Sequence, residues 1–160
     1  PKTYMPDQMD RLSFYTALYS VNNLQELEDL KEEMEDRFGK FSILVQRLFD
    51  AATLKYYSAL ALFEKVVIQR KIIIIVLPNS KKEEYYDNYF NSLIKYLYSH
   101  YGEKIKFSQQ NDVFKLIINN QFVTAENMLD FLINFAKEII NLLKPETGDT
   151  LRISQNENTN

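Results

Sequence analysis

Apolar positions in the first part of the chain recur at helical spacing and divide it into segments. The first segment follows Asp7, ends at the Asn22-Asn23 pair, and carries an apolar stripe at Leu12, Tyr15, Leu18 and Tyr19. The second begins at an N-cap at Asn23, where Glu26 is placed to complete a capping box. It ends at Gly39, which can adopt the left-handed conformation of a helix C-terminus.

The same spacing selects the faces that the helices bury. The second segment places Leu27, Leu30, Met34 and Phe38 on one side. A third segment follows the N-cap Ser42, and we expect it to bury Leu44, Leu48, Ala51 and Leu54, with small alanines permitting close helix approach. The first 62 residues are therefore predicted to form three packed helices.

The period then changes to that of strands. Residues 64–68 and 72–77 are rich in β-branched side chains and flank a polar turn, which predicts a hairpin with a deeply buried second strand that ends at Pro78. Residues 104–108 and 113–118 predict a second hairpin across Gln110-Asn111. The run 72–76 could also serve as an exposed edge for strand addition, although a buried central strand is its usual meaning.

Two further helices complete the pattern. Ser80 and Glu83 form a second capping box, before a helix whose apolar side is Tyr86, Phe90, Leu93 and Leu97. Thr124 can cap a last helix with Met128, Leu132, Phe135, Ile139 and Leu142 on one face. The predicted fold class is α+β: an N-terminal three-helix segment, then a small, mainly antiparallel sheet of about four strands in two hairpins, packed with two further helices.

The length of the chain suits a single domain. We expect residues 1–143 to form one compact domain with a large aromatic core, and residues 144–160, which lack apolar periodicity, to be a disordered tail. Because the chain opens at Pro1 rather than at Met, we expect it to be part of a longer protein.

Charge and cysteine content narrow the classes of partner. A formal net charge of -3 argues against a general nucleic-acid surface, which needs clustered Lys and Arg. The absence of cysteine excludes disulfides and thiolate zinc ligands and suits a reducing cytoplasm. The longest apolar run, residues 72–77, is too short to span a bilayer. We expect a cytoplasmic protein without a membrane partner.

Residues for catalysis or cofactor binding are missing from the sequence. The three glycines are Gly39, Gly102 and Gly148, so that no glycine-rich phosphate loop can form. The single histidine, His100, has no neighbouring carboxylate pair, cysteine or second histidine with which to build a triad or metal site. We predict no catalytic, cofactor-binding or metal-binding residue in this chain, and no enzymatic activity.

Acidic side chains gather on the second helix. Asp29, Glu33 and Asp36 form a stripe on the side away from the apolar face, broadened by Glu28, Glu32 and Glu35. A solvated helix surface is the ordinary interpretation of such a stripe. The alternative is a docking face for Arg or Lys of another module, to which charge-assisted pairs give register and reversibility.

A second candidate surface is the helix predicted within residues 81–104. It combines aromatic and basic side chains: Tyr85, Tyr86, Tyr89, Tyr96, Tyr98, Tyr101, Lys81, Lys82, Lys95 and Lys104. Such a set could bind single-stranded nucleic acid, although tyrosines at the boundary of a core are the commoner meaning. An accessory module for single strands is therefore the alternative function.

Several short segments together resemble the C-terminal domain of the bacterial transcription-repair coupling factor family. They are Tyr4-Met5-Pro6-Asp7, Arg11-Leu12 with Tyr15, Glu26-Leu27, Glu33 with Asp36-Arg37-Phe38-Gly39, and Leu54-Lys55. The rest of the chain, to residue 143, is similar to the family in layout. There are two departures: Lys40-Phe41-Ser42 replaces a proline-bearing turn, and Leu62 replaces the glycine that commonly ends the third helix.

The resemblance implies a role within an ATP-driven double-stranded DNA translocase that displaces stalled RNA polymerase and recruits the excision-repair protein UvrA. ATP and Mg would be used by the motor domains, not by this one. In that family the C-terminal domain docks on the UvrA-binding N-terminal module and masks it. By position, Glu33 and Asp36 are implied to make this contact, with Asp29 extending the stripe, and Arg37, Phe38 and Gly39 are expected to be structural.

Overall fold

The computed structural model describes residues 5, 7–119, 121, 123–124 and 126–144. Three helices come first, α1 (Gln8–Tyr19), α2 (Leu24–Phe38) and α3 (Ile43–Leu60), followed by strands β1 (Lys65–Ile68) and β2 (Ile72–Val76). Then come α4 (Glu83–Tyr85), the π-helix η1 (Tyr86–Phe90), α5 (Asn91–Tyr101), the 3-10 turn η2 (Gly102–Lys104), β3 (Ile105–Gln110), β4 (Val113–Asn119) and α6 (Met128–Leu143). The predicted α+β fold class is confirmed. The tail predicted at 144–160 lies outside the described residues, apart from Lys144.

Local capping explains where the first three helices begin. The Asp7 carboxylate accepts the backbone N–H of Met9 at 2.7 Å, and the Asn23 side chain accepts that of Glu26 at 2.9 Å. The Ser42 hydroxyl accepts the N–H of Val45 at 3.3 Å. The predicted caps Asn23 and Ser42 are confirmed, and Asp7, which was expected to precede the first helix, caps it. In a capping box the Glu26 carboxylate would accept the N–H of Asn23. It instead accepts the N–H of Asn22, one residue earlier, at 2.8 Å.

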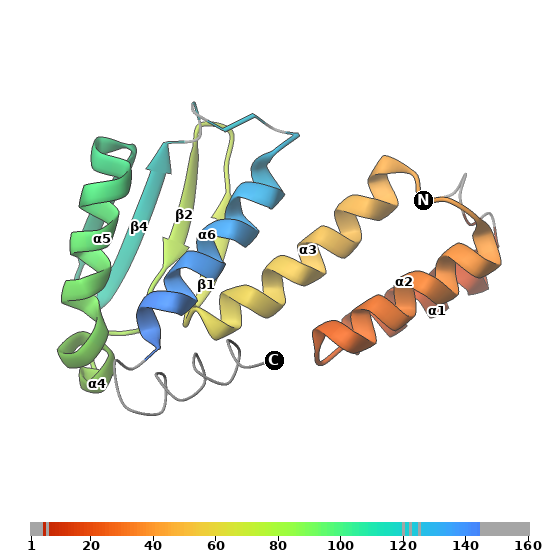
Figure 1. Ribbon diagram of the computed structural model, residues 1–160, viewed down its shortest axis with the longest axis horizontal. Helices are drawn as coiled ribbons and strands as arrows, with labels where there is room; N and C mark the ends of the chain where they lie inside the picture. The colour runs from red at the N-terminus through yellow and green to blue at the C-terminus, as the bar shows by residue number, and fades with distance from the viewer. Residues whose placement is uncertain (1–4, 6, 120, 122, 125, 145–160) are drawn as a thin grey trace, which may run out of the picture.

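The buried side chains form two clusters that share α3 (Figure 1). The helical cluster consists of Met5, Phe14, Leu27, Leu30, Met34, Val45 and Phe49. The sheet cluster joins the inner face of the sheet to α5, α6 and the C-terminal half of α3, which contributes Leu54. The prediction for α3 was partly wrong: Leu44 is 60% exposed and Ala51 is also exposed, because Val45 and Phe49 occupy the inward side of this helix.

The sheet is fully antiparallel in the order β1-β2-β4-β3. Cross-strand neighbours such as Ile73 with Ile118 and Ile75 with Leu116 are buried under α5 and α6, which lie on the same face of the sheet (Figure 1). The strand β2 is central, as predicted. Its deep burial was predicted for the whole run, but it holds for only one face, since Ile72, Ile74 and Val76 stay partly exposed.

The helix starts predicted at Ser80 and at Thr124 are wrong. The Ser80 hydroxyl donates to the Asp112 carboxylate at 2.9 Å, and α4 begins after Lys82 without a side-chain cap. The last helix begins at Met128, after Asn127, so Thr124 is not its cap. The single helix expected within residues 81–104 is divided into α4, η1, α5 and η2.

Leu62 lies just after α3 and has a left-handed backbone, with φ at +62°. This is a conformation that glycine adopts without steric cost and a leucine only with strain. A glycine, which the family resemblance leads us to expect at this position, would adopt this backbone without that strain.

A carboxylate joins α5 to α6. Tyr96 and Tyr101 of α5 both donate their hydroxyls to Glu138 of α6, at 2.8 and 2.7 Å. Burial, and then the hydrogen bond and charge of Glu138, raise the pKa of Tyr101 above its ordinary value. The same causes raise the pKa of Tyr96. The neutral phenols are thus the stable forms in the folded protein.

Replacing Glu138 by Gln should lower the free energy of unfolding by about 1 kcal/mol at neutral pH, because the two hydrogen bonds lose their charge assistance. A phenol whose pKa is raised on folding contributes stability that is present below its unfolded pKa of about 10 and is lost as the pH rises. Glu138→Gln makes the shifts in the two tyrosine pKa values smaller. The difference in free energy of unfolding between the wild type and the variant should therefore narrow above about pH 10. Urea unfolding over a pH series measures it, with Glu84→Gln as an exposed control. A gap that is independent of pH would contradict this account.

Candidate functional site

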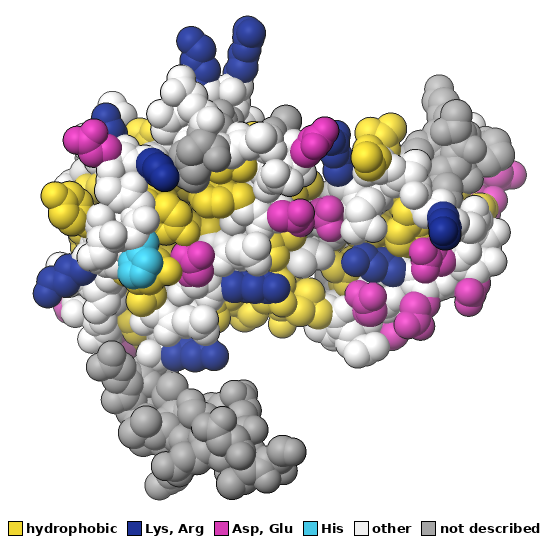
Figure 2. Space-filling view, turned by 45° about the horizontal axis from the view of Figure 1, so that its top comes forward, with side chains coloured by type: hydrophobic (Ala, Val, Ile, Leu, Met, Phe, Trp, Pro, Cys, Tyr) yellow, Lys and Arg dark blue, Asp and Glu magenta, His cyan; other side chains and the backbone are white. Residues whose placement is uncertain are grey.

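The helix α2 presents its acidic residues on the side opposite the helical cluster. Leu27, Leu30 and Met34 are buried at 3%, 8% and 3% exposure, whereas Asp29, Glu33 and Asp36 are all exposed. Helical geometry puts residues three and four apart on one face, which explains both stripes. Figure 2 shows Asp and Glu side chains gathered over the helical end of the molecule. The structure thus brings the three predicted site residues together on one surface.

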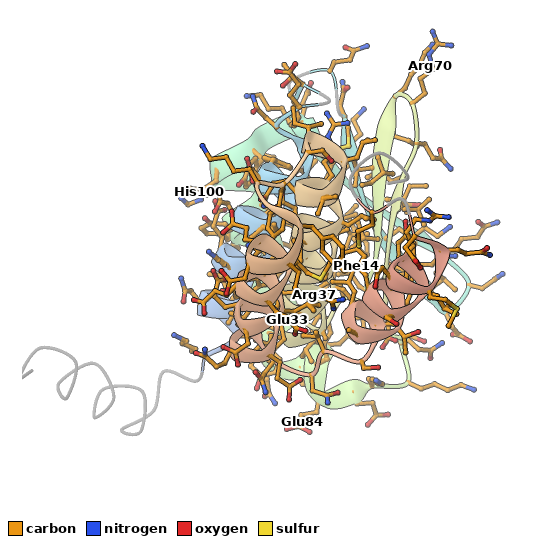
Figure 3. All side chains as sticks on the ribbon, turned by 90° about the vertical axis from the view of Figure 1, so that its right-hand side faces the viewer. Phe14, Glu33, Arg37, Arg70, Glu84 and His100 are labelled. Atoms are coloured by element: carbon orange, nitrogen blue, oxygen red, sulfur yellow. The ribbon has the colours of Figure 1, made fainter. Side chains whose placement is uncertain are left out.

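The three acids differ in their local partners. Asp29 accepts a hydrogen bond from the Gln25 side chain at 2.9 Å, one helical turn earlier. Glu33 lies 3.9 Å from the Arg37 guanidinium, a long and exposed ion pair (Figure 3). Asp36 has no ion pair within 4 Å among the described residues. Exposed pairs of this kind contribute about 0–1 kcal/mol, so the carboxylates are available to another molecule at little cost.

Arg37, Phe38 and Gly39, which were expected to be structural, make contacts within the N-terminal helices. One Arg37 nitrogen lies 3.3 Å from the Asp10 carboxylate of α1, and the guanidinium lies over the Phe38 ring at 5.0 Å. The salt bridge links α1 to α2. Phe38 packs against the helical cluster. Gly39 ends α2 with φ at +83°, and its N–H donates to the Glu35 carbonyl at 2.8 Å.

Between α1 and α2 lies a hollow of about 370 Å³ with an acidic rim. Glu26, Asp29 and Glu33 border it, and its other wall consists of Ala17 of α1 with Ser20 and Val21, which follow that helix. Sequence analysis missed these three residues. The small size of Ala17 and Ser20, three residues apart, could have indicated them, because small side chains leave room beside a helix. The hollow gives a basic side chain space to enter between several carboxylates.

A second hollow, of about 530 Å³, lies among all three N-terminal helices and is mainly apolar. Ala51, Ala52 and Lys55 of α3 line it together with Tyr15 of α1 and Leu24 of α2. The alanines of α3, which we expected to permit close helix approach, instead line this open groove.

The tyrosines and lysines of 81–104 do not converge on one exposed surface. Tyr85 is only 4% exposed, and Tyr86, Tyr89, Tyr96 and Tyr101 pack against the sheet cluster, whereas Tyr98 is 79% exposed. Lys82 forms an ion pair with Glu64 at 3.3 Å. A stacking surface for bases needs several exposed rings side by side. These contacts favour the core-boundary interpretation of the tyrosines.

The described part of the chain contains no group of three or more His, Cys, Asp or Glu side chains arranged to hold a metal ion. His100 is exposed, stacks on Tyr96 at 3.9 Å between ring centroids, and places Nδ1 3.0 Å from the Tyr96 carbonyl oxygen. Within the same described residues, no helix combines the length and hydropathy needed to cross a membrane.

The fold defines a class of domain: an α+β unit in which a long third helix joins a three-helix layer with an acidic surface to an antiparallel sheet covered by helices on one face. A sequence model of the TRCF domain matches residues 1–88. The chain belongs to this family and is a C-terminal domain of the transcription-repair coupling factor type.

Known proteins of that description are similar to different lengths of the chain. The transcription-repair-coupling factor of Bacillus subtilis (strain 168) is 24% identical over 150 residues, which cover 94% of this chain and 12% of that protein. The one from Escherichia coli (strain K12) is 40% identical over 55 residues, covering 34% of this chain and 5% of that protein. The chain thus spans only a small fraction of the length of these relatives.

A solved structure shares the fold. The crystal structure of the C-terminal domain of a transcription-repair coupling factor superposes with a TM-score of 0.75 at 20% sequence identity, and the alignment covers 92% of this chain and 89% of that chain. The likeness extends over both the helical layer and the sheet, whereas the family match ends at residue 88.

Proposed function

We propose that this chain is the regulatory domain of an ATP-dependent DNA translocase that displaces stalled RNA polymerase and recruits UvrA for nucleotide excision repair in the bacterial cytoplasm. The domain docks through Asp29, Glu33 and Asp36 on the UvrA-binding module of the same protein and masks it. One observation carries the proposal: the three carboxylates share an exposed face of α2 whose opposite side is anchored in the helical cluster. ATP and Mg are bound by the motor domains.

The physical character of this face suits a reversible contact. Exposed ion pairs contribute about 0–1 kcal/mol each, so a few of them cannot hold two free proteins together. Within one protein the linker raises the effective concentration of the partner module, and a weak contact then becomes sufficient. A competing partner can open it, which is the property that a regulatory contact requires.

Reversing two charges should weaken the docking. In the Glu33→Lys/Asp36→Lys variant, attraction to basic residues is replaced by repulsion of similar size, so affinity for the UvrA-binding module should fall about tenfold or more. The free energy of unfolding should change by less than about 1 kcal/mol, since both positions are exposed. Titration of the labelled module with each variant, by fluorescence anisotropy at low and at physiological salt, measures the effect.

The matched control is Glu84→Lys/Asp87→Lys, which makes the same change of charge on α4 and η1; Figure 1 shows α4 at the opposite end of the molecule from α2. The control variant should bind like the wild type. In the full-length protein the α2 variant should bind UvrA more tightly than the wild type does. Equal UvrA affinity of the two full-length proteins, or docking that ignores both salt and the α2 charges, would refute the proposed function.

A further inference from the structure

The sheet has a second face that no helix in the described part of the chain covers. Alternate side chains of a strand point to opposite faces, so the register identifies the outward ones. They are aliphatic at the centre and basic around it, and we call them the open sheet face: Val67, Ile72, Ile74, Val76, Val113, Ile117, Lys65, Lys106 and Lys115. In the register Val67 is opposite Ile74, and Ile74 is opposite Ile117, so three strands contribute one apolar row.

Burial separates this face from the core. Ile73, Ile75, Leu116 and Ile118 belong to the sheet cluster, whereas the aliphatic residues of the open sheet face are neither members of it nor packed against it among the described residues. They are partly exposed, and Val113 is 39% exposed. One end of the face is hollowed to about 520 Å³, over Ile72, Ile117 and Lys106.

The composition of the open sheet face is unusual for a solvated surface. An antiparallel sheet with one wet face normally alternates apolar and polar residues, and a continuous apolar strand is typical of a sheet covered on both faces. The strand β2 is Ile72-Ile73-Ile74-Ile75-Val76, yet only its Ile73 side is covered by described helices. A contiguous exposed apolar patch on a folded domain indicates a binding surface.

The charges on the open sheet face indicate what kind of partner would cover it. Among the described residues, Lys65, Lys106 and Lys115 take part in no ion pair within 4 Å. The other outward strand positions are Ser108, Gln110 and Asn119, so the strands themselves place no acidic side chain on this face. Acidic residues lie at its border, where Glu103 lines the hollow beside Lys106 and Asp112 lies beside Val113. Arg70, at the tip of the β1–β2 hairpin, adds positive charge to its border (Figure 3). A complementary partner would present an apolar stripe flanked by Asp and Glu side chains.

We infer that the open sheet face is a second docking surface, which binds an acidic amphipathic helix of a partner protein. The helix would lay its apolar stripe on the row Val67, Ile74 and Ile117 and its carboxylates beside the lysines. A single strand of nucleic acid fits less well, because bases stack on exposed aromatic rings. The aromatic rings of these strands, Phe107 and Phe114, lie on the helix side, at 5.2 and 6.1 Å from the Phe90 ring. This inference concerns the sheet and not the helix α2, and it stands apart from the proposed function.

The probe is a labelled designed peptide with leucines on one helical face and glutamates on the other, titrated into the 160-residue chain. Binding should shift the amide NMR signals of β2 and β4. Lys106→Glu/Lys115→Glu should reduce its affinity at least about tenfold, and Ile74→Ser should also weaken it without a change of charge. The matched control is Lys81→Glu/Lys95→Glu, which reverses two exposed lysines outside the four strands and should leave binding unchanged.

Other results would overturn the inference. They are peptide-induced shifts confined to α1–α3, equal binding by the two double variants, or equal binding of a peptide of the same composition in scrambled order. Tighter binding of an oligothymidylate to this face would assign it to nucleic acid instead. A dimer in sedimentation that Ile74→Ser dissociates would assign it to a second copy of the chain. Lys106 is exposed and Lys115 is partly exposed, so the lysine variant should fold. Its folding, checked by circular dichroism, keeps the test valid if Ile74→Ser is unstable.

Discussion

Replacing Phe49 by Ala should lower the free energy of unfolding by about 3–5 kcal/mol, the loss expected when a fully buried phenylalanine leaves a cavity. Phe49 has no exposed surface and is central to the helical cluster. Its ring lies 5.7 Å from that of Phe14 on α1 and 5.0 Å from that of Phe41, and Lys31 of α2 lies over it at 5.7 Å. All three N-terminal helices therefore lose a contact at once.

Urea unfolding followed by circular dichroism measures this loss, and hydrogen exchange locates it. Protection should fall first in α1 and α2, because they pack only through the helical cluster, while the strands are held by the sheet cluster. The control is Ile43→Ala on the same helix, where the side chain is 70% exposed and the expected change is within about 0.5 kcal/mol. A loss of less than about 1 kcal/mol at Phe49 would show that the helices do not depend on this ring.

Replacing Gly39 by Ala should lower the free energy of unfolding by about 1–3 kcal/mol, since its backbone lies in a region that is nearly restricted to glycine. The dihedral angles are φ +83° and ψ -167°. An added Cβ would meet no atom within 4 Å, so the expected cost comes from the backbone itself and not from a steric clash. The strain should also disturb the end of α2, where Asp36 and Arg37 lie.

The neighbouring substitution Lys40→Ala changes an exposed side chain next to Gly39 and should alter stability by no more than about 0.5 kcal/mol. Thermal and urea unfolding of both variants, with amide NMR shifts around Asp36, would test the account. If Gly39→Ala is as stable as the wild type, the turn between α2 and α3 must be able to adopt another conformation.

The two candidate surfaces divide the charge of the domain between its two layers. The acidic face is on α2, over the helical cluster, and the basic, apolar open sheet face is on the far side of the sheet cluster. The helix α3 contributes to both clusters, through Phe49 and Leu54. A partner on one surface therefore leaves the other accessible, and the domain can make two contacts of opposite charge.

The predictions that succeeded depend on short-range chemistry. Asp7, Asn23 and Ser42 cap helices because each side chain reaches an N–H two or three residues further along, whatever the rest of the chain does. The acidic stripe is equally local, since helical spacing alone separates Asp29, Glu33 and Asp36 from the buried leucines.

The predictions that failed depend on which element lies opposite. The helix α3 is apolar on more than one side, so its sequence allows Leu44 or Val45 to face inward, and packing against α1 and α2 selects Val45. Ser80 has the right spacing for a cap, yet its hydroxyl bonds Asp112, which is distant in sequence and close in space. Local spacing contains no information about such partners.

By itself, the sequence determined the order of helices and strands, three helix caps, the acidic stripe and the family resemblance, because each follows from residues close together in the chain. Only the tertiary structure decided which side of α3 is buried, that Arg37 joins Asp10, and that the helices of the described residues cover one face of β2 and leave the other open. Those outcomes depend on the packing of layers, in which residues far apart in sequence compete for the same apolar surface.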